Sequence, residues 1–138
     1  MPHENSLYPA EWTRIAEKDM RRVDRLLDGH DPELAGFCLQ QAVEKFLKGF
    51  LLSQGWKLRR THNLDALLDD AVTYDASLEK FRTICQKISA FYFVERYPLI
   101  VETGITEEDV RTSLEQVAEL VKTLRIQAKD LASVKKQD

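Results

Sequence analysis

Hydrophobic residues recur three and four positions apart along most of the chain, which is the spacing of one face of an α-helix. This pattern predicts four long helices and a short one. The long helices run from about Pro9 to Gly29, from Pro32 to Gln54, from Ser77 to just before Tyr97, and from Thr106 to about Ala132. The short helix has Asn63 as its N-cap and carries Leu64, Leu67, Leu68 and Val72. Because the connections are short, neighbouring helices are expected to be antiparallel.

Several predicted helix ends carry residues suited to capping. Asp31 is an N-cap followed by Pro32 at the first helical position, and Gly55 is expected to be the C-cap of the same helix. Thr106 and Asp109 approximate a capping box, with aspartate in place of the usual Glu or Gln. The predicted fold class is therefore all-α, a compact bundle of about five helices.

The chain has 138 residues, which suits one domain with its own hydrophobic core. We expect this domain over residues 1–138, with a core of about 9–132 and frayed tails. The net charge is −3, whereas a protein that binds nucleic acid mainly through phosphates is usually basic. The first residues do not resemble a signal peptide, and the apolar runs are too short to span a bilayer. A cytoplasmic protein with no membrane association is expected.

Familiar catalytic and metal-binding motifs are missing from the sequence. The 5 glycines are too scattered to form a phosphate-binding loop, and the 3 histidines lack the spacing of metal ligands. Cys38 and Cys85 each lie among apolar residues, and we interpret them as buried thiols in a reducing compartment. No metal site and no required cofactor are predicted, so functional residues must be sought among polar groups in apolar surroundings.

The second predicted helix has the most unusual polar pattern. Apolar residues cover more than half of its circumference, so this helix is expected to be central to the fold. The remaining arc contains Gln40, Gln41, Glu44, Lys45 and Lys48. This arc is either a solvated face with pairs such as Glu44 and Lys48, or a polar groove that faces another helix or subunit. Gly49 costs about 1 kcal/mol relative to alanine in a helix interior, which a close helix crossing would explain.

Two further segments concentrate groups that could bind an anion. Tyr92 and Tyr97 bracket Arg96, whose guanidinium suits phosphate, while tyrosine offers a stacking face. The alternative is an arginine favoured by the helix dipole beside two packing aromatic residues. The loop over residues 56–62 contains Lys57, Arg59, Arg60 and His62. It is either a solvated loop or an anion site next to Arg96.

Together these residues resemble the HEPN family, the "higher eukaryotes and prokaryotes nucleotide-binding" domains. The resemblance runs from about Trp12 to Leu124. Its most specific part is the Gln-Gln-Ala-x-Glu-Lys-x-x-Lys run that begins at Gln40. The other parts are Trp12, Ala16 and Asp19 in the first helix, Thr61-His62-Asn63-Leu64, and Tyr92 followed by Glu95-Arg96-Tyr97-Pro98.

The resemblance implies an up-and-down four-helix bundle with an additional short helix. It also implies a homodimer, with the ends of the second and fourth helices near the subunit interface. Many such domains are encoded beside a minimal nucleotidyltransferase as a toxin–antitoxin pair. Toxin members are metal-independent ribonucleases with an arginine followed, after four to six residues, by a histidine. Arg96 matches that arginine, but the positions where the histidine would fall are Val101, Glu102 and Thr103. The resemblance is therefore to a non-nucleolytic member.

Three functions are hypothesised. The first is a dimeric module that binds a nucleotide, or a minimal nucleotidyltransferase partner, through a groove between the second and fourth helices. Its binding residues would be Gln41, Lys45, Lys48, Tyr92, Arg96 and Tyr97, with Asp19 and Glu44 orienting the cations. The second is a ribonuclease toxin with a displaced catalytic histidine, which would use Arg96 and His62; RNA is a possible partner but is not favoured. The third is a structural dimerisation domain whose groove holds only an ion-pair network.

Overall fold

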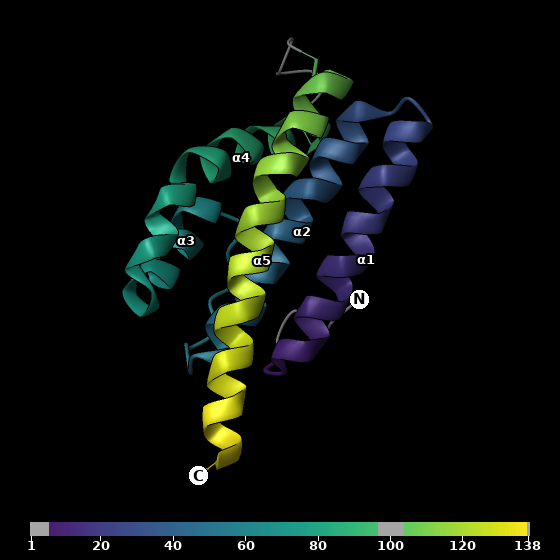
Figure 1. Ribbon diagram of the computed structural model, residues 1–138. Coiled ribbons are helices and arrows are strands. Elements are labelled where there is room, and N and C mark those ends of the chain that lie inside the picture. Colours follow the sequence, from purple (N-terminus) through teal and green to yellow (C-terminus); the bar gives the residue numbers. More distant parts are fainter. Residues whose placement is uncertain (1–5, 97–103, 138) are drawn as a thin grey trace.

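A computed structural model describes residues 6–96 and 104–137 of the chain, and the side chains of residues 6–93 and 104–126. The described residues form five α-helices and a 3-10 helix, with no strand among them. The elements are α1 (Pro9–Asp28), α2 (Pro32–Ser53), α3 (Leu64–Tyr74), η1 (Ala76–Phe81), α4 (Arg82–Arg96) and α5 (Glu107–Gln137). Helices α1, α2, α4 and α5 alternate in direction, and α3 lies at the side (Figure 1). The predicted all-α bundle is confirmed.

Helix α2 is the centre of the bundle, as its apolar circumference predicts. It packs against α1, α3, α4 and α5, and most extensively against α1. Leu39, Leu47 and Leu51 of α2 are fully buried. At Gly49, an added Cβ atom would lie 2.8 Å from Oγ1 of Thr13 and 3.3 Å from the carbonyl oxygen of Pro9, both in α1. The close helix crossing predicted from this glycine is therefore present.

The predicted N-caps are confirmed by their hydrogen bonds. The Asp31 side chain accepts a hydrogen bond from Leu34 N–H, and the Asn63 side chain accepts one from Ala66 N–H. Thr106 N–H donates to the Asp109 carboxylate, and Asp109 N–H donates to the Thr106 hydroxyl, both at 3.1 Å. The bond from the Thr106 backbone favours the charged carboxylate and lowers the pKa of Asp109.

Three helix boundaries differ from the predictions. Helix α2 ends at Ser53 with Gln54 as its C-cap, and Gly55 follows with a φ of 89°. Gly55 thus occupies the left-handed position just after the cap, where the Trp56 N–H can bond back to the Leu51 carbonyl. The turn before α4 is the 3-10 helix η1. Helix α5 continues to Gln137, beyond the predicted end near Ala132.

The end of α1 yields a first testable prediction. Its C-cap Gly29 has a φ of −85°, and the left-handed position is taken by the exposed His30, with a φ of 62°. Because a Cβ atom disfavours that backbone conformation, His30→Gly should raise the free energy of unfolding by about 0.5–1 kcal/mol in a urea titration. His30→Ala keeps the Cβ atom and serves as the control. Equal stability of the glycine and alanine variants would contradict this account.

The two cysteines have different environments. Cys85 is fully buried in α4, and burial raises the pKa of its thiol to about 12. At neutral pH this thiol is therefore protonated and unreactive. Cys38 is only half-buried, and no disulfide joins it to Cys85. Among the described residues, no helix is long and apolar enough to cross a membrane.

Candidate functional site

The polar arc of α2 lies inside the protein. The exposed fractions of Gln40, Glu44, Lys45 and Lys48 are between 1% and 5%, and only Gln41 is half-buried. The interpretation of this arc as a solvated face is therefore wrong. Buried charges are costly unless they are paired and hydrogen-bonded, so their partners define the site.

Helix α1 supplies the carboxylate that pairs with Lys45. The Lys45 ammonium lies 2.6 Å from Oδ2 of Asp19, and both side chains are buried. The other oxygen of Asp19 accepts a hydrogen bond from Arg22 at 2.6 Å. Asp19 thus holds Lys45 against α1.

A second buried pair lies one turn further along α2. The Lys48 ammonium lies 3.0 Å from Oε2 of Glu44, which is the predicted i,i+4 pair, although it is in the interior. The same ammonium lies 5.2 Å from the ring centroid of Trp12 in α1. A cation over an indole face is attracted by the ring quadrupole. Glu44 and Trp12 together therefore position Lys48.

The same cluster holds His62, which belongs to the loop before α3. Nδ1 of His62 lies 2.9 Å from Oε1 of Glu44, and the Gln40 amide donates to the His62 carbonyl oxygen at 3.2 Å. Gln41 in turn donates to Oε1 of Gln40 at 2.8 Å. Both the ring and the backbone of His62 are therefore fixed from α2, although the side chain itself is 64% exposed.

His62 lies at a groove between the start of α3 and helix α4. The groove has a volume of about 280 Å³ and is lined by Gln40, His62, Asn63, Asp65, Gln86, Ser89, Tyr92 and Phe93. The Tyr92 ring stacks on His62 with centroids 5.8 Å apart, and on Phe37 with centroids 5.6 Å apart. We call this the aromatic groove. It combines ring faces with amide and hydroxyl groups.

The predicted site residues fall into three groups. Tyr92 and His62 line the aromatic groove. Gln41, Lys45 and Lys48, with Asp19 and Glu44, belong to the buried cluster beside it. Arg96 is the last residue of α4, but its side chain lies outside the described residues, as do Tyr97 and residues 101–103.

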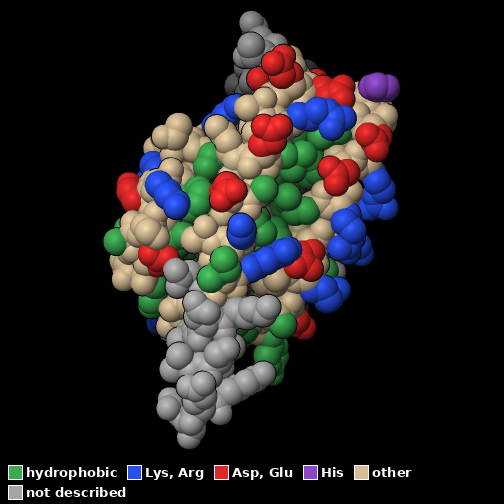
Figure 2. All heavy atoms as spheres, in the orientation of Figure 1, with side chains coloured by type: hydrophobic (Ala, Val, Ile, Leu, Met, Phe, Trp, Pro, Cys, Tyr) green, Lys and Arg blue, Asp and Glu red, His purple; other side chains and the backbone are tan. Residues whose placement is uncertain are grey.

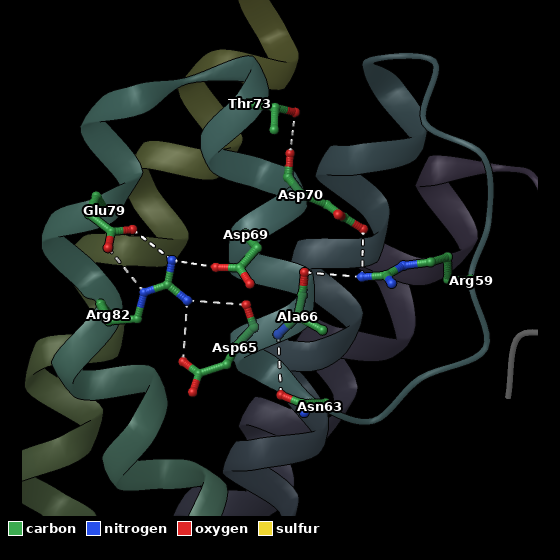
Figure 3. Close-up of polar contacts among 9 residues, drawn as sticks. All are labelled: Arg59, Asn63, Asp65, Ala66, Asp69, Asp70, Thr73, Glu79 and Arg82. Atoms are coloured by element: carbon green, nitrogen blue, oxygen red, sulfur yellow. Dashed lines mark hydrogen bonds and ion pairs between the residues drawn. The ribbon is translucent and has the colours of Figure 1, made fainter.

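The basic loop is attached to α3. Arg59 donates to the carbonyl oxygen of Ala66 at 3.2 Å and pairs with the Asp70 carboxylate at 2.9 Å (Figure 3). Trp56 also donates to Asp70, at 2.9 Å. Arg59 therefore anchors the loop to α3, and its charge is matched within the chain.

Helices α3 and α4 are joined by a further set of charges that the sequence did not reveal. Arg82 of α4 pairs with Glu79, Asp69 and Asp65, and Figure 3 shows these carboxylates around its guanidinium. The hydrogen bonds that Arg82 donates to the Glu79 carboxylate are the largest cause of the raised pKa of Arg82. Arg82 therefore fixes α3 against α4.

Among the described side chains, no group of His, Cys, Asp and Glu is placed to hold a metal ion.

Sequence reasoning missed several residues of the aromatic groove. Gln86, Ser89 and Phe93 recur along one face of α4, three and four positions apart, next to Tyr92. That spacing was available in the sequence, and Phe93 is 52% exposed, which is unusual for such a large apolar side chain. The sequence predicts Asn63 as a helix cap and as part of the segment that resembles the HEPN family, but not as a residue of the groove that it also lines.

These features define the class of protein: a small helical-bundle domain with a buried polar cluster beside an aromatic groove. The HEPN domain profile matches residues 9–127, so the chain belongs to the HEPN domain family. It is also similar to a crystal structure described as an archaeal HEPN homologue, with a TM-score of 0.64 and 25% sequence identity. That match covers 88% of this chain and 98% of the other. A search of curated proteins found no match.

Proposed function

We propose that this HEPN domain binds a nucleotide with its base in the aromatic groove. The observation that carries the proposal is the juxtaposition of ring faces, from Tyr92, Phe93 and His62, with the polar groups of Asn63 and Ser89. Stacking of a base on an aromatic side chain contributes roughly 1–3 kcal/mol. Amide and hydroxyl groups can then form hydrogen bonds with the base edge.

The size of the groove limits the ligand. A volume of about 280 Å³ lies at the lower end of small-molecule sites, which span about 300–1,000 Å³. One base with its ribose is therefore a better match than a dinucleotide. The Asp65 carboxylate lies in the groove wall, so phosphates would lie away from it. We keep Arg96 and Tyr97 as proposed phosphate and base contacts.

In this proposal the buried cluster supports the groove. Glu44 and Gln40 hold the ring and the backbone of His62, and His62 in turn stacks on Tyr92. Lys45 and Lys48 are paired with Asp19 and Glu44, and we now assign them to this supporting role. Preorganised side chains reduce the entropy lost when a ligand binds.

A homodimer and a minimal nucleotidyltransferase partner are further parts of the proposal. Their support is the membership of the chain in the HEPN family. The pair would then act as a two-component toxin–antitoxin system. Purification of the tagged protein from its source cell would support this if a small nucleotidyltransferase co-purified in near-equal amounts. Purification of the domain alone, as a monomer, would contradict it.

The binding proposal predicts a specific loss in Tyr92→Ala. Isothermal titration calorimetry with each of the common ribonucleotides should show binding to the unmodified protein, weakened about 5- to 150-fold in Tyr92→Ala because a stacking face is lost. Tyr92→Phe should retain most of the affinity. Tyr74→Ala removes an exposed tyrosine outside the groove, at the end of α3, and is the control. Absence of nucleotide binding at millimolar concentrations would refute the proposal.

One observation favours a second candidate, ribonuclease activity with His62 as the displaced catalytic residue. A buried carboxylate that accepts a hydrogen bond from Nδ1 leaves Nε2 to take a proton, which is the arrangement of a general base. The base would remove the proton of an RNA 2′-hydroxyl as its oxygen attacks the adjacent phosphorus. The bond from phosphorus to the 5′-oxygen of the next nucleotide would break, that oxygen would leave with a proton from solvent, and a 2′,3′-cyclic phosphate would remain. Cleavage that is lost in both His62→Ala and Glu44→Gln would establish this candidate. No cleavage at high protein concentration would exclude it.

A further inference from the structure

A second and larger groove lies on a different face, between α1 and α5. Its volume is about 730 Å³, and its apolar lining comes from Met20 of α1, Phe46 of α2, and Val121 and Ile126 of α5. Figure 2 shows hydrophobic side chains along the seam between α5 and α1, with charged side chains on both sides. This groove shares no lining residue with the aromatic groove.

The shape of this groove suits a helix. Helices α1 and α5 run in opposite directions and each packs against α2, which forms the floor between them (Figure 1). The lining residues of α5 extend from Ala118 to Ile126, a length on the order of 12 Å, or about two helical turns. A two-turn apolar groove between helices is typical of sites that accept the apolar face of an amphipathic helix.

The charges around the groove are predominantly basic. Glu17 is paired with Arg125 at 2.5 Å, and the Arg125 guanidinium lies 5.5 Å from the ring centroid of Phe46. Arg21 and Lys122 also line the groove, and neither has an acidic partner among the described side chains. The net charge of the whole protein is −3, so the groove differs in sign from the protein as a whole. It is complementary to an acidic occupant.

A second copy of this chain does not match these charges. If two copies met through this groove about a two-fold axis, each Arg21 and Lys122 would face the same basic residues. Like charges brought together in an interface are unfavourable.

We propose that the α1–α5 groove binds an amphipathic helix of a partner protein, with an apolar stripe of about two turns flanked by Asp or Glu. The stripe would lie on Met20, Phe46 and Val121, and the acidic residues would pair with Arg21 and Lys122. Arg125 would swing aside from Phe46 as the helix enters. This proposal is independent of the nucleotide proposal, because it concerns other residues on another face.

Two synthetic helical peptides of about four turns test the proposal. Both carry the same leucine stripe and a fluorescent label; one has glutamate beside the stripe and the other has lysine. In fluorescence anisotropy at low salt, the glutamate peptide should bind about tenfold more tightly, and added salt should reduce the difference. The preference should reverse in the double variant Arg21→Glu/Lys122→Glu.

Two further variants make the test specific. Ala118→Trp should block both peptides, because it fills the groove from an exposed position. Lys57→Glu/Lys80→Glu makes the same change in net charge on exposed residues elsewhere and should leave the preference unchanged. Equal binding of the two peptides, no binding of either, or a preference that survives the double variant would each overturn the proposal. So would a dimer in sedimentation that Ala118→Trp dissociates, because the occupant would then be a second copy.

Discussion

Replacing Glu44 by alanine is expected to lower the free energy of unfolding by about 3–5 kcal/mol. The change leaves the ammonium of Lys48, a residue that is 4% exposed, in the interior without its carboxylate. It also removes the hydrogen bond that holds the His62 ring. Urea titration followed by circular dichroism measures the loss, and an unchanged denaturant slope would show that the folded state is intact.

The double variant Glu44→Leu/Lys48→Met is the control for this first prediction. It removes both charges at similar volume and should recover most of the lost stability, because no unpaired charge remains. A decrease in the free energy of unfolding below about 1 kcal/mol in Glu44→Ala would contradict the burial of the Glu44–Lys48 pair, because exposed ion pairs contribute no more than that. The charge-swapped variant Glu44→Lys/Lys48→Glu tests the third hypothesis, a structural dimerisation domain. If a dimer is lost in Glu44→Ala and restored only by the swapped pair, the ion-pair network serves dimerisation.

Replacing Trp12 by alanine is expected to cost about 3–5 kcal/mol. The Trp12 side chain is 3% exposed, and its indole N–H donates to the Ser6 carbonyl oxygen at 2.9 Å. The substitution therefore opens a cavity between α1 and α2 and also removes the ring face from Lys48. The same urea titration measures the loss, and a calorimetric titration with nucleotide would test whether the cavity also disturbs the proposed binding in the groove.

Trp56 is the matched control for Trp12. It is half-buried, and its indole N–H donates a hydrogen bond to the Asp70 carboxylate at 2.9 Å. Trp56→Ala should therefore cost clearly less than Trp12→Ala, and equal losses would contradict the proposed role of Trp12. Combining Trp12→Ala with Lys48→Met should give less than the sum of the two losses, because residues in contact are energetically coupled.

The parts of the fold that the sequence predicts correctly depend on local chemistry. Asp31 and Asn63 identify helix starts because their side chains bond to a backbone N–H within the next turn. Gly49 indicates a helix crossing because glycine in a helix interior needs a compensating close approach. The end of α5 was predicted less well, since its final residues continue the helix without a glycine or proline to stop it.

The buried cluster could be predicted only in part. A helical wheel shows that Lys45 and Lys48 share an arc, but it cannot show what covers that arc. The covering residues are distant in sequence: Asp19 is 26 positions from Lys45, and His62 is 18 positions from Glu44. The resemblance to the HEPN family identified the same residues, but their burial required the packing of α1 and the loop before α3.

The position of the buried cluster along the chain has a consequence for biosynthesis. Its charged pairs and the ring over Lys48 all lie between Trp12 and His62. These charges can therefore be neutralised while α4 and α5 are still being translated. What must wait for the later helices is the apolar side of α2, which α4 and α5 cover in the finished protein. A nascent chain paused before α4 would therefore expose an apolar surface to ribosome-bound chaperones. The buried ion pairs between Trp12 and His62 would already be formed.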